Sequence, residues 1–198
     1  MVENRAAFAE VIESSLQGWV AQSWQWDRFP PFGSLVSVQA GSRILFGVVH
    51  EVSTGSTDSV RQPFAYKKTE QELREQQPQI FEFLRTTFSC LTIGYLERGT
   101  IRHTLAPAPP KIHAFVQPPE KDMAKRFLAH DGYLYPLFGG GNQHFNLDEL
   151  LLALLSYHES LGILTERTIE QFMQSYSLLT GNDYRRVKLF LHRAQALF

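Results

Sequence analysis

The sequence contains a single cysteine, Cys90, among its 198 residues. One thiol cannot form an intramolecular disulfide, and this is typical of a protein from a reducing compartment. No apolar run approaches the roughly 18 residues that a membrane-spanning helix needs. The N-terminal stretch MVENRAAFAEVIESSLQGW mixes acidic side chains through its length, unlike a signal peptide. We therefore expect a cytoplasmic protein without a membrane partner.

The common signatures of metal and nucleotide sites are also missing. The seven histidines show no H-x-x-x-H or H-E-x-x-H spacing, and a Cys-x-x-Cys pair needs a second cysteine. The glycine run at residues 139–141 continues into Asn142, Gln143 and His144, where a P-loop has lysine followed by serine or threonine. We expect no bound metal, no cofactor and no P-loop motor domain.

Charge of either sign is not in surplus. The 19 basic and 20 acidic residues leave a formal net charge of -1, which gives no general attraction for nucleic acid or anionic lipid. A barrel face that binds nucleic acid would need cations alternating with aromatic residues, and the expected strands and turns supply little beyond Arg43, Arg98 and Arg102. The expected partner is a protein or a second copy of this chain.

Strand composition dominates the first half of the chain after Phe32. Residues 35–38 and 44–52 are β-branched and apolar around a turn at residues 40–42, which predicts a hairpin. We expect burial to alternate along residues 44–52, with Gly47 at a point where a side chain would obstruct packing. Further strands are expected at residues 90–96, 101–105 and 112–116, and residues 53–63 should form a loop.

Helical spacing marks the remaining segments. Thr69 and Glu72 have the spacing of a capping box, and a second helix follows Pro78 and extends to Phe88. An N-terminal helix is predicted from the spacing of five apolar residues: Phe8, Val11, Ile12, Leu16 and Trp19. After residues 118–119, three amphipathic helices are expected: one from Asn146 to Gly162, one that ends at Gly181, and a last helix.

The predicted fold class is α+β, with a small closed β-barrel, an inserted helix and a C-terminal helical bundle. The expected segments are residues 1–31 as an N-terminal helical segment, 32–117 as the barrel and 118–198 as the helical domain. The change of character near residues 117–120 sets the second boundary.

The order of strand, turn, strand, polar loop and short helix leading into a strand resembles the HAS-barrel. The resemblance is carried by LFGVVHEV, with Phe46, Gly47 and Val48 as its hydrophobic-Gly-hydrophobic pattern, and by PQIFEFLRTTFSCLTIGYLERG. HAS-barrels precede the motor domains of HerA-type translocases and of rotary ATP synthase catalytic subunits. The resemblance implies a stand-alone barrel that docks on a P-loop ATPase ring, on a partner's barrel or on itself.

Two surfaces could bind a partner. Four cations fall within nine residues of the last helix: Arg185, Arg186, Lys188 and Arg193. They form either an ordinary solvated face or a contact surface for an acidic partner. An aromatic group either plugs the barrel or offers an apolar docking surface: Trp19, Trp24, Trp26, Phe29 and Phe32. The leading hypothesis is a non-catalytic module for protein binding or self-association.

The alternative is a small enzyme or a phosphate- or nucleic-acid-binding protein. His130, Asp131 and His144 flank the glycine-rich segment and could act as an acid-base set if it folds back. Residues 139–144 could cradle a phosphate ahead of the helix that Asn146 begins. Cys90 and His158 have simpler explanations, as a small core residue and as a partly buried histidine with one hydrogen-bond partner.

Overall fold

The computed structural model describes residues 6–57, 64–139 and 145–195. Seven strands are present in this part of the chain: β1 (Ala9–Ser14), β2 (Gly18–Ser23), β3 (Leu35–Ala40), β4 (Arg43–Ser56), β5 (Leu84–Glu97), β6 (Thr100–Arg102) and β7 (Phe115–Gln117). The described helices are α1 (Glu70–Gln76), α2 (Gln79–Glu82), α3 (Lys121–Leu128), the 3-10 turn η1 (Asp131–Tyr133), α4 (Leu134–Gly139), α5 (Leu147–Leu161), α6 (Glu166–Leu179) and α7 (Tyr184–Gln195).

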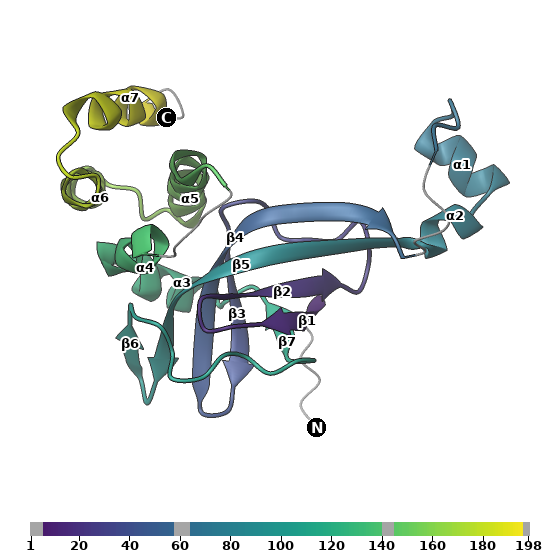
Figure 1. Ribbon diagram of the computed structural model, residues 1–198, viewed down its shortest axis with the longest axis horizontal. Coiled ribbons are helices and arrows are strands. Elements are labelled where there is room, and N and C mark those ends of the chain that lie inside the picture. The colour runs from purple at the N-terminus through teal and green to yellow at the C-terminus, as the bar shows by residue number, and fades with distance from the viewer. Residues whose placement is uncertain (1–5, 58–63, 140–144, 196–198) are drawn as a thin grey trace.

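The strands form a closed antiparallel barrel. The sheet order is β2-β1-β7-β3-β4-β5-β6, and an additional pairing between β2 and β5 closes six strands into the barrel while β6 extends β5 at its edge. Helices α5, α6 and α7 follow the barrel in the chain and stack on one side of it (Figure 1). The predicted α+β fold, a closed barrel followed by helices, is confirmed.

The prediction of an N-terminal helix is wrong. Residues 9–14 and 18–23 form β1 and β2, which are two strands of the barrel. Residues 1–31 are therefore not a helical segment that precedes the barrel. Val11 and Trp19 point into the barrel, whereas Leu16 lies exposed in the turn between the strands. Ala9 and Val11, then Trp19 and Ala21, are buried at a spacing of two, the period of a strand. Only Val11 and Trp19 belong both to this pattern and to the predicted helical spacing.

Strand β4 separates two cores. Leu45 and Val49 belong to the interior of the barrel, whereas Phe46 and Val48 face outward and pack under the helices. Burial is therefore continuous from residue 45 to residue 49, and the expected alternation of burial is wrong because both faces of the strand are covered. The residues alternate between two buried cores instead.

Gly47 has the packing role that the sequence predicted. A Cβ atom at this position would lie 2.4 Å from Cη2 of Trp19, closer than any real side chain tolerates. The obstacle is the edge of an indole ring inside the barrel, not a neighbouring backbone. The close approach of β4 and Trp19 therefore requires glycine.

The long β4–β5 hairpin extends beyond the barrel. The pairing continues from Val52↔Phe88 to Ser56↔Leu84, so β4 reaches into the expected loop at residues 53–63, and the helix expected up to Phe88 ends at Glu82. Helix α1 begins with the predicted capping box, in which Thr69 Oγ1 accepts from the backbone of Glu72 and the Glu72 carboxylate accepts from the backbone of Thr69. Figure 1 shows α1 and α2 at the far end of this hairpin, away from α5–α7.

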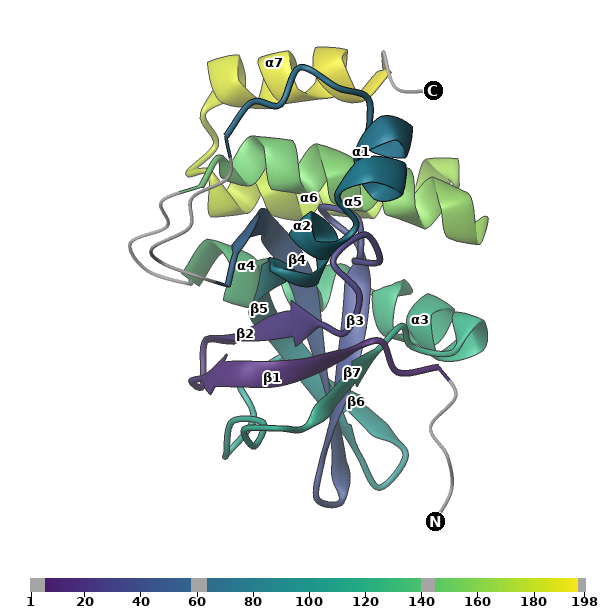
Figure 2. The ribbon, with the colours of Figure 1, turned by 90° about the vertical axis from the view of Figure 1, so that its right-hand side faces the viewer.

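The C-terminal helices share a core with the barrel. Asn146 caps α5 through its side-chain oxygen, and α5 ends at Gly162, both as predicted. The outward residues of β4 join leucines of α4 and α5 and aromatic residues of α6 and α7 in one buried cluster. Helix α7 forms the outermost layer, over α5 and α6 and farthest from the strands (Figure 2). Most residues of α7 are exposed, and only Phe190 and Ala194 are buried.

Candidate functional site

Two of the four cations on α7 are engaged within the molecule. Arg186 donates from Nε and Nη2 to the two carboxylate oxygens of Asp148 on α5, at 3.1 Å and 2.7 Å. The hydrogen bond to Asp148 raises the pKa of Arg186 above its ordinary value. Arg193 contacts Glu149 at 2.5 Å. These two arginines hold α7 on α5, so the four cations do not form one solvated face.

The other two cations point away from the core. Arg185 and Lys188 are exposed, and the ion pairs found among the described residues include neither. At 100° per residue, Arg185, Lys188 and His192 lie on the side of α7 opposite the buried Phe190 and Ala194. Large apolar residues flank them, namely Tyr184, Leu189 and Leu191, and the first two are 72% and 68% exposed. We call these six residues the α7 outer face.

The predicted acid-base set consists of His130, Asp131 and His144, and the described part of the chain shows no site that these residues form together. His130 is exposed, and the Asp131 carboxylate accepts a hydrogen bond from the hydroxyl of Ser175 on α6. His144 lies outside the described residues, as does the glycine-rich segment apart from Gly139. Gly139 is the last residue of α4, and the phosphate cradle predicted ahead of Asn146 falls mainly on residues 140–144, so the described residues do not test it.

The aromatic group divides between the interior and the surface. Trp19 fills the barrel and is only 3% exposed, whereas Trp24, Phe29 and Phe32 are exposed. Trp26 stacks on Phe81 of α2, with ring centroids 5.6 Å apart. A largely apolar groove of about 270 Å³ lies between the barrel and α5, and its lining is Phe8, Arg28, Phe29, Pro30, Pro31, Ser34, Leu35, Val36, Pro118 and Tyr157.

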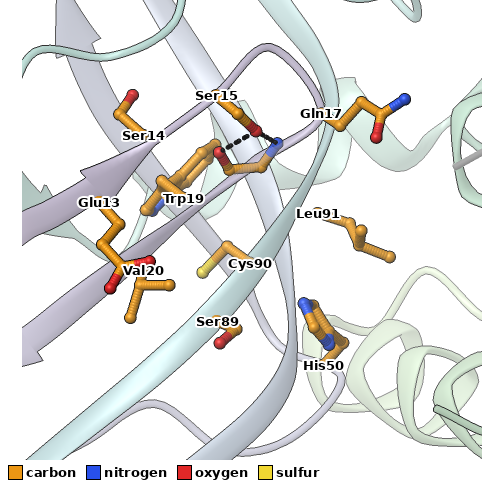
Figure 3. A pocket seen from close by; sticks show the side chains of 11 residues that line it. Glu13, Ser14, Ser15, Gln17, Trp19, Val20, His50, Ser89, Cys90 and Leu91 are labelled. Carbon is orange, nitrogen blue, oxygen red and sulfur yellow. Dashed lines mark hydrogen bonds between the residues drawn. The ribbon is translucent and has the colours of Figure 1, made fainter. Parts of the chain in front are cut away.

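A second concavity, of about 350 Å³, opens where the β1–β2 turn crosses β5. We call it the turn pocket, and Figure 3 shows the side chains that line it. The lining residues are Glu13, Ser14, Ser15, Gln17, Gly18, Trp19, Val20, His50, Ser89, Cys90 and Leu91. The hydroxyl of Ser15 bonds to the backbone of Gly18, which fixes the turn. Trp19 and Cys90 stand out in the sequence, but the pocket does not, because the apolar spacing around Trp19 predicts a helix where the structure has β1 and β2.

Cys90 is a core residue, as expected. Its side chain is buried at the centre of the β2–β5–β4 pairing, opposite both Trp19 and Val49. Burial raises the pKa of the Cys90 thiol well above its ordinary value, so the thiol stays protonated at neutral pH. A protonated, buried thiol is a poor nucleophile.

No cluster of three or more His, Cys, Asp or Glu side chains that could hold a metal occurs among the described residues. None of the described helices is both long enough and apolar enough to cross a membrane. Comparison of the chain with protein-family models and with curated proteins found no match. The similarity to the HAS-barrel therefore rests on the quoted residues and is consistent with the closed barrel.

Proposed function

We propose that this protein is a non-catalytic binding module and that the α7 outer face binds an acidic segment of a protein partner. The observation that carries the proposal is the pairing state of the cations: Arg186 and Arg193 are neutralised by α5, while Arg185 and Lys188 point outward beside exposed Tyr184 and Leu189. The sequence also shows no motif for a nucleophile, a metal or a nucleotide.

The chemistry of this face favours an acidic segment that carries apolar residues. Single exposed leucines are ordinary, but a partner can bury Tyr184 and Leu189 together. Carboxylates placed between them would meet Arg185 and Lys188 and speed the encounter of the two proteins. A membrane or nucleic-acid partner is less well supported, because the chain as a whole carries a net charge of -1.

The similarity to the HAS-barrel supports two sources for such a segment. One is the ring of a P-loop ATPase, and the other is a second copy of this chain, whose charge outside α7 is acidic. The single cysteine supports a cytoplasmic location. The barrel and the inner helices then serve as the rigid support of α7.

A zero-length carbodiimide cross-linker tests the proposal, because it joins a lysine amine to a carboxylate in direct contact. The full chain is cross-linked in cytoplasmic extract of its own cells and the peptides joined to Lys188 are identified by mass spectrometry. Binding to the identified protein, or to a second copy, is then measured for Arg185→Glu/Lys188→Glu. We expect affinity to fall by about tenfold or more, with weaker wild-type binding at raised salt.

The matched control is Lys121→Glu/Arg126→Glu on α3, which changes two exposed cations and the net charge by the same amount. The control variant should bind like the wild type. Equal loss in both variants would show a dependence on net charge alone, and unchanged binding of the α7 variant would exclude the α7 outer face.

A further inference from the structure

The two helices between β4 and β5, α1 and α2, contain no buried residue. They have seven and four residues, and helices this short are marginal in water unless other parts of a protein pack on them. They lie at the end of the β4–β5 hairpin, beyond the barrel (Figure 1). We call residues 69–83, which contain both helices, the hairpin tip. Every residue of the hairpin tip is exposed or partly exposed, so the described part of the chain leaves this surface open.

Arg74 holds the hairpin tip in a defined shape. Its guanidinium pairs with Glu70 at 2.8 Å and lies 3.6 Å from the carboxylate of Asp27, in the segment that follows β2. The same group lies 4.7 Å from the centre of the Phe81 ring, which stacks on Trp26. The positive charge of Arg74 is thus matched inside the molecule, and an ion pair and a ring contact attach the tip to the segment after β2.

Two carboxylates of the hairpin tip have no ion-pair partner within the described part of the chain. These are Glu75 and Glu82, and both are exposed. Lys67 and Lys68 directly precede the tip, and Lys68 donates to the amide oxygen of Gln76. Glu75 lies in the last turn of α1, where the helix dipole disfavours a negative charge. A cation supplied by a partner would therefore be stabilising here.

Apolar side chains accompany these carboxylates. Phe83 directly follows Glu82 and is 38% exposed, and Leu73 and Ile80 are partly exposed. The hairpin tip is thus a short acidic segment that carries apolar residues. The α7 outer face has the opposite charge beside exposed apolar residues of its own, so the two surfaces are complementary.

The hairpin tip and α7 lie toward opposite ends of the longest axis of the molecule (Figure 1). A chain therefore cannot place its own tip on its own α7 outer face, whereas a second copy can. The contact uses a different surface on each copy, which makes it heterologous. Each copy then offers one tip and one α7 outer face to its neighbours.

We propose that the hairpin tip of one copy of this chain binds the α7 outer face of another copy. Glu75 and Glu82 meet the cations of that face, Arg185 and Lys188, and the apolar residues of the two surfaces pack beside them. This inference rests on the proposed function, because it names the acidic segment that the α7 outer face binds. It also gives α1 and α2 a surface on which to pack.

Analytical ultracentrifugation of the purified full chain, at concentrations up to about 1 mM, tests this contact, because a small surface on each copy binds weakly. We expect the wild type to associate as its concentration rises. Glu75→Lys/Glu82→Lys should weaken this association by about tenfold or more. The matched control is Glu120→Lys/Asp122→Lys, an exposed pair at the start of α3 with the same change of charge. The control variant should associate like the wild type.

Mixing two variants tests whether the contact is heterologous. Arg185→Glu/Lys188→Glu keeps a wild-type hairpin tip. Glu75→Lys/Glu82→Lys keeps a wild-type α7 outer face. Neither variant should associate well alone, whereas an equal mixture should associate through the surface that each variant retains. Zero-length cross-linking of mixed unlabelled and ¹⁵N-labelled wild type should join Lys188 of one copy to Glu75 or Glu82 of the other.

The inference is overturned if the wild type stays monomeric at every concentration, or if the cross-links of Lys188 in the associated protein include no carboxylate of the hairpin tip. These wild-type readings decide the matter even where a variant fails to fold. A monomeric wild type whose Lys188 is joined to another protein in extract would exclude the second copy and leave the proposed function standing. The proposed function itself fails only if Arg185→Glu/Lys188→Glu binds that protein unchanged.

Discussion

Arg186 on α7 forms a two-point ion pair with the carboxylate of Asp148 on α5, and this pair connects α7 to the other helices. Oδ1 of Asp148 accepts from Nη2 of Arg186 at 2.7 Å and from the hydroxyl of Tyr176 at 3.0 Å, while Oδ2 accepts from Nε of Arg186. The guanidinium also lies 6.0 Å from the centre of the Tyr176 ring. One acidic side chain thus connects α5, α6 and α7.

Arg186→Gln should lower the free energy of unfolding by about 1–2 kcal/mol, because two charge-assisted hydrogen bonds are lost at a partly exposed site. Arg185→Gln, one residue earlier and exposed, should stay within about 0.5 kcal/mol of the wild type. Urea unfolding of both variants measures the difference. Equal stability of the two variants would contradict a structural role for Arg186 and would return it to the solvated surface that the sequence suggested.

Gly47→Ala should destabilise the barrel by about 1–3 kcal/mol, since its Cβ would overlap the Trp19 ring and force that ring or the strand to move. Gly55→Ala is the matched control on the same strand, because nothing lies within 4 Å of its Cβ position. That variant should be neutral or slightly stabilising. Thermal unfolding of the two proteins checks the pair, and a similar loss in both would show that strand flexibility, not Trp19, requires glycine.

The sequence predicted the fold class correctly, but it did not predict the first two strands of the barrel, β1 and β2. The β-branched run of β4 and the capping residues Thr69 and Asn146 are local signals, and the structure bears them out. Around Val11 and Trp19 the apolar residues fit both helical and strand spacing, and only the pairing of β2 with the distant β5 decides between them. Non-local pairing of this kind leaves no trace in a short sequence window.

Contacts between distant parts of the chain also decide which of the predicted site residues are free to bind a partner. Arg185, Arg186, Lys188 and Arg193 look alike in the sequence, and they differ only because the carboxylates of α5 reach two of them. His50 carried no signal beyond being a polar residue in an apolar strand. Its place in the lining of the turn pocket depends on a bulge in β4, which is set by the register of two strands that meet about forty residues apart in the chain.

Gly33 sets the distance between the barrel and α5. It adopts a φ of 79°, and its Cβ would lie 2.4 Å from Cβ of Ala153 and 2.8 Å from the Ala153 carbonyl carbon. Gly41 also has a positive φ, of 64°, but no neighbour within 4 Å. Gly41→Ala should therefore cost only about 1–2 kcal/mol of conformational strain. Gly33→Ala should cost at least about 1–3 kcal/mol more, because α5 must move away. Chemical denaturation compares the two, and equal losses would show that conformation alone matters at Gly33.

His158 is buried on α5 with a partner at each ring nitrogen, one more than the sequence suggested. Nδ1 lies 2.7 Å from the carbonyl oxygen of Leu154, which can only accept, so Nδ1 carries the proton and donates. In the neutral ring Nε2 is then the acceptor, and the hydroxyl of Tyr133 donates to it at 3.2 Å. Burial raises the pKa of Tyr133, which keeps its hydroxyl protonated as this arrangement requires.

Protonation of His158 should destabilise the fold in acid. Burial lowers the pKa of His158 from 6.5 to about 4, so between these values the unfolded chain binds a proton that the folded chain excludes. The free energy of unfolding should therefore fall as the pH is lowered from 6.5 to about 4, by up to about 3 kcal/mol from this group. His158→Gln removes the titrating ring and should flatten the pH profile by that amount. Urea titrations at several pH values measure both proteins, and parallel profiles for wild type and His158→Gln would mean that His158 titrates alike in the folded and unfolded chain.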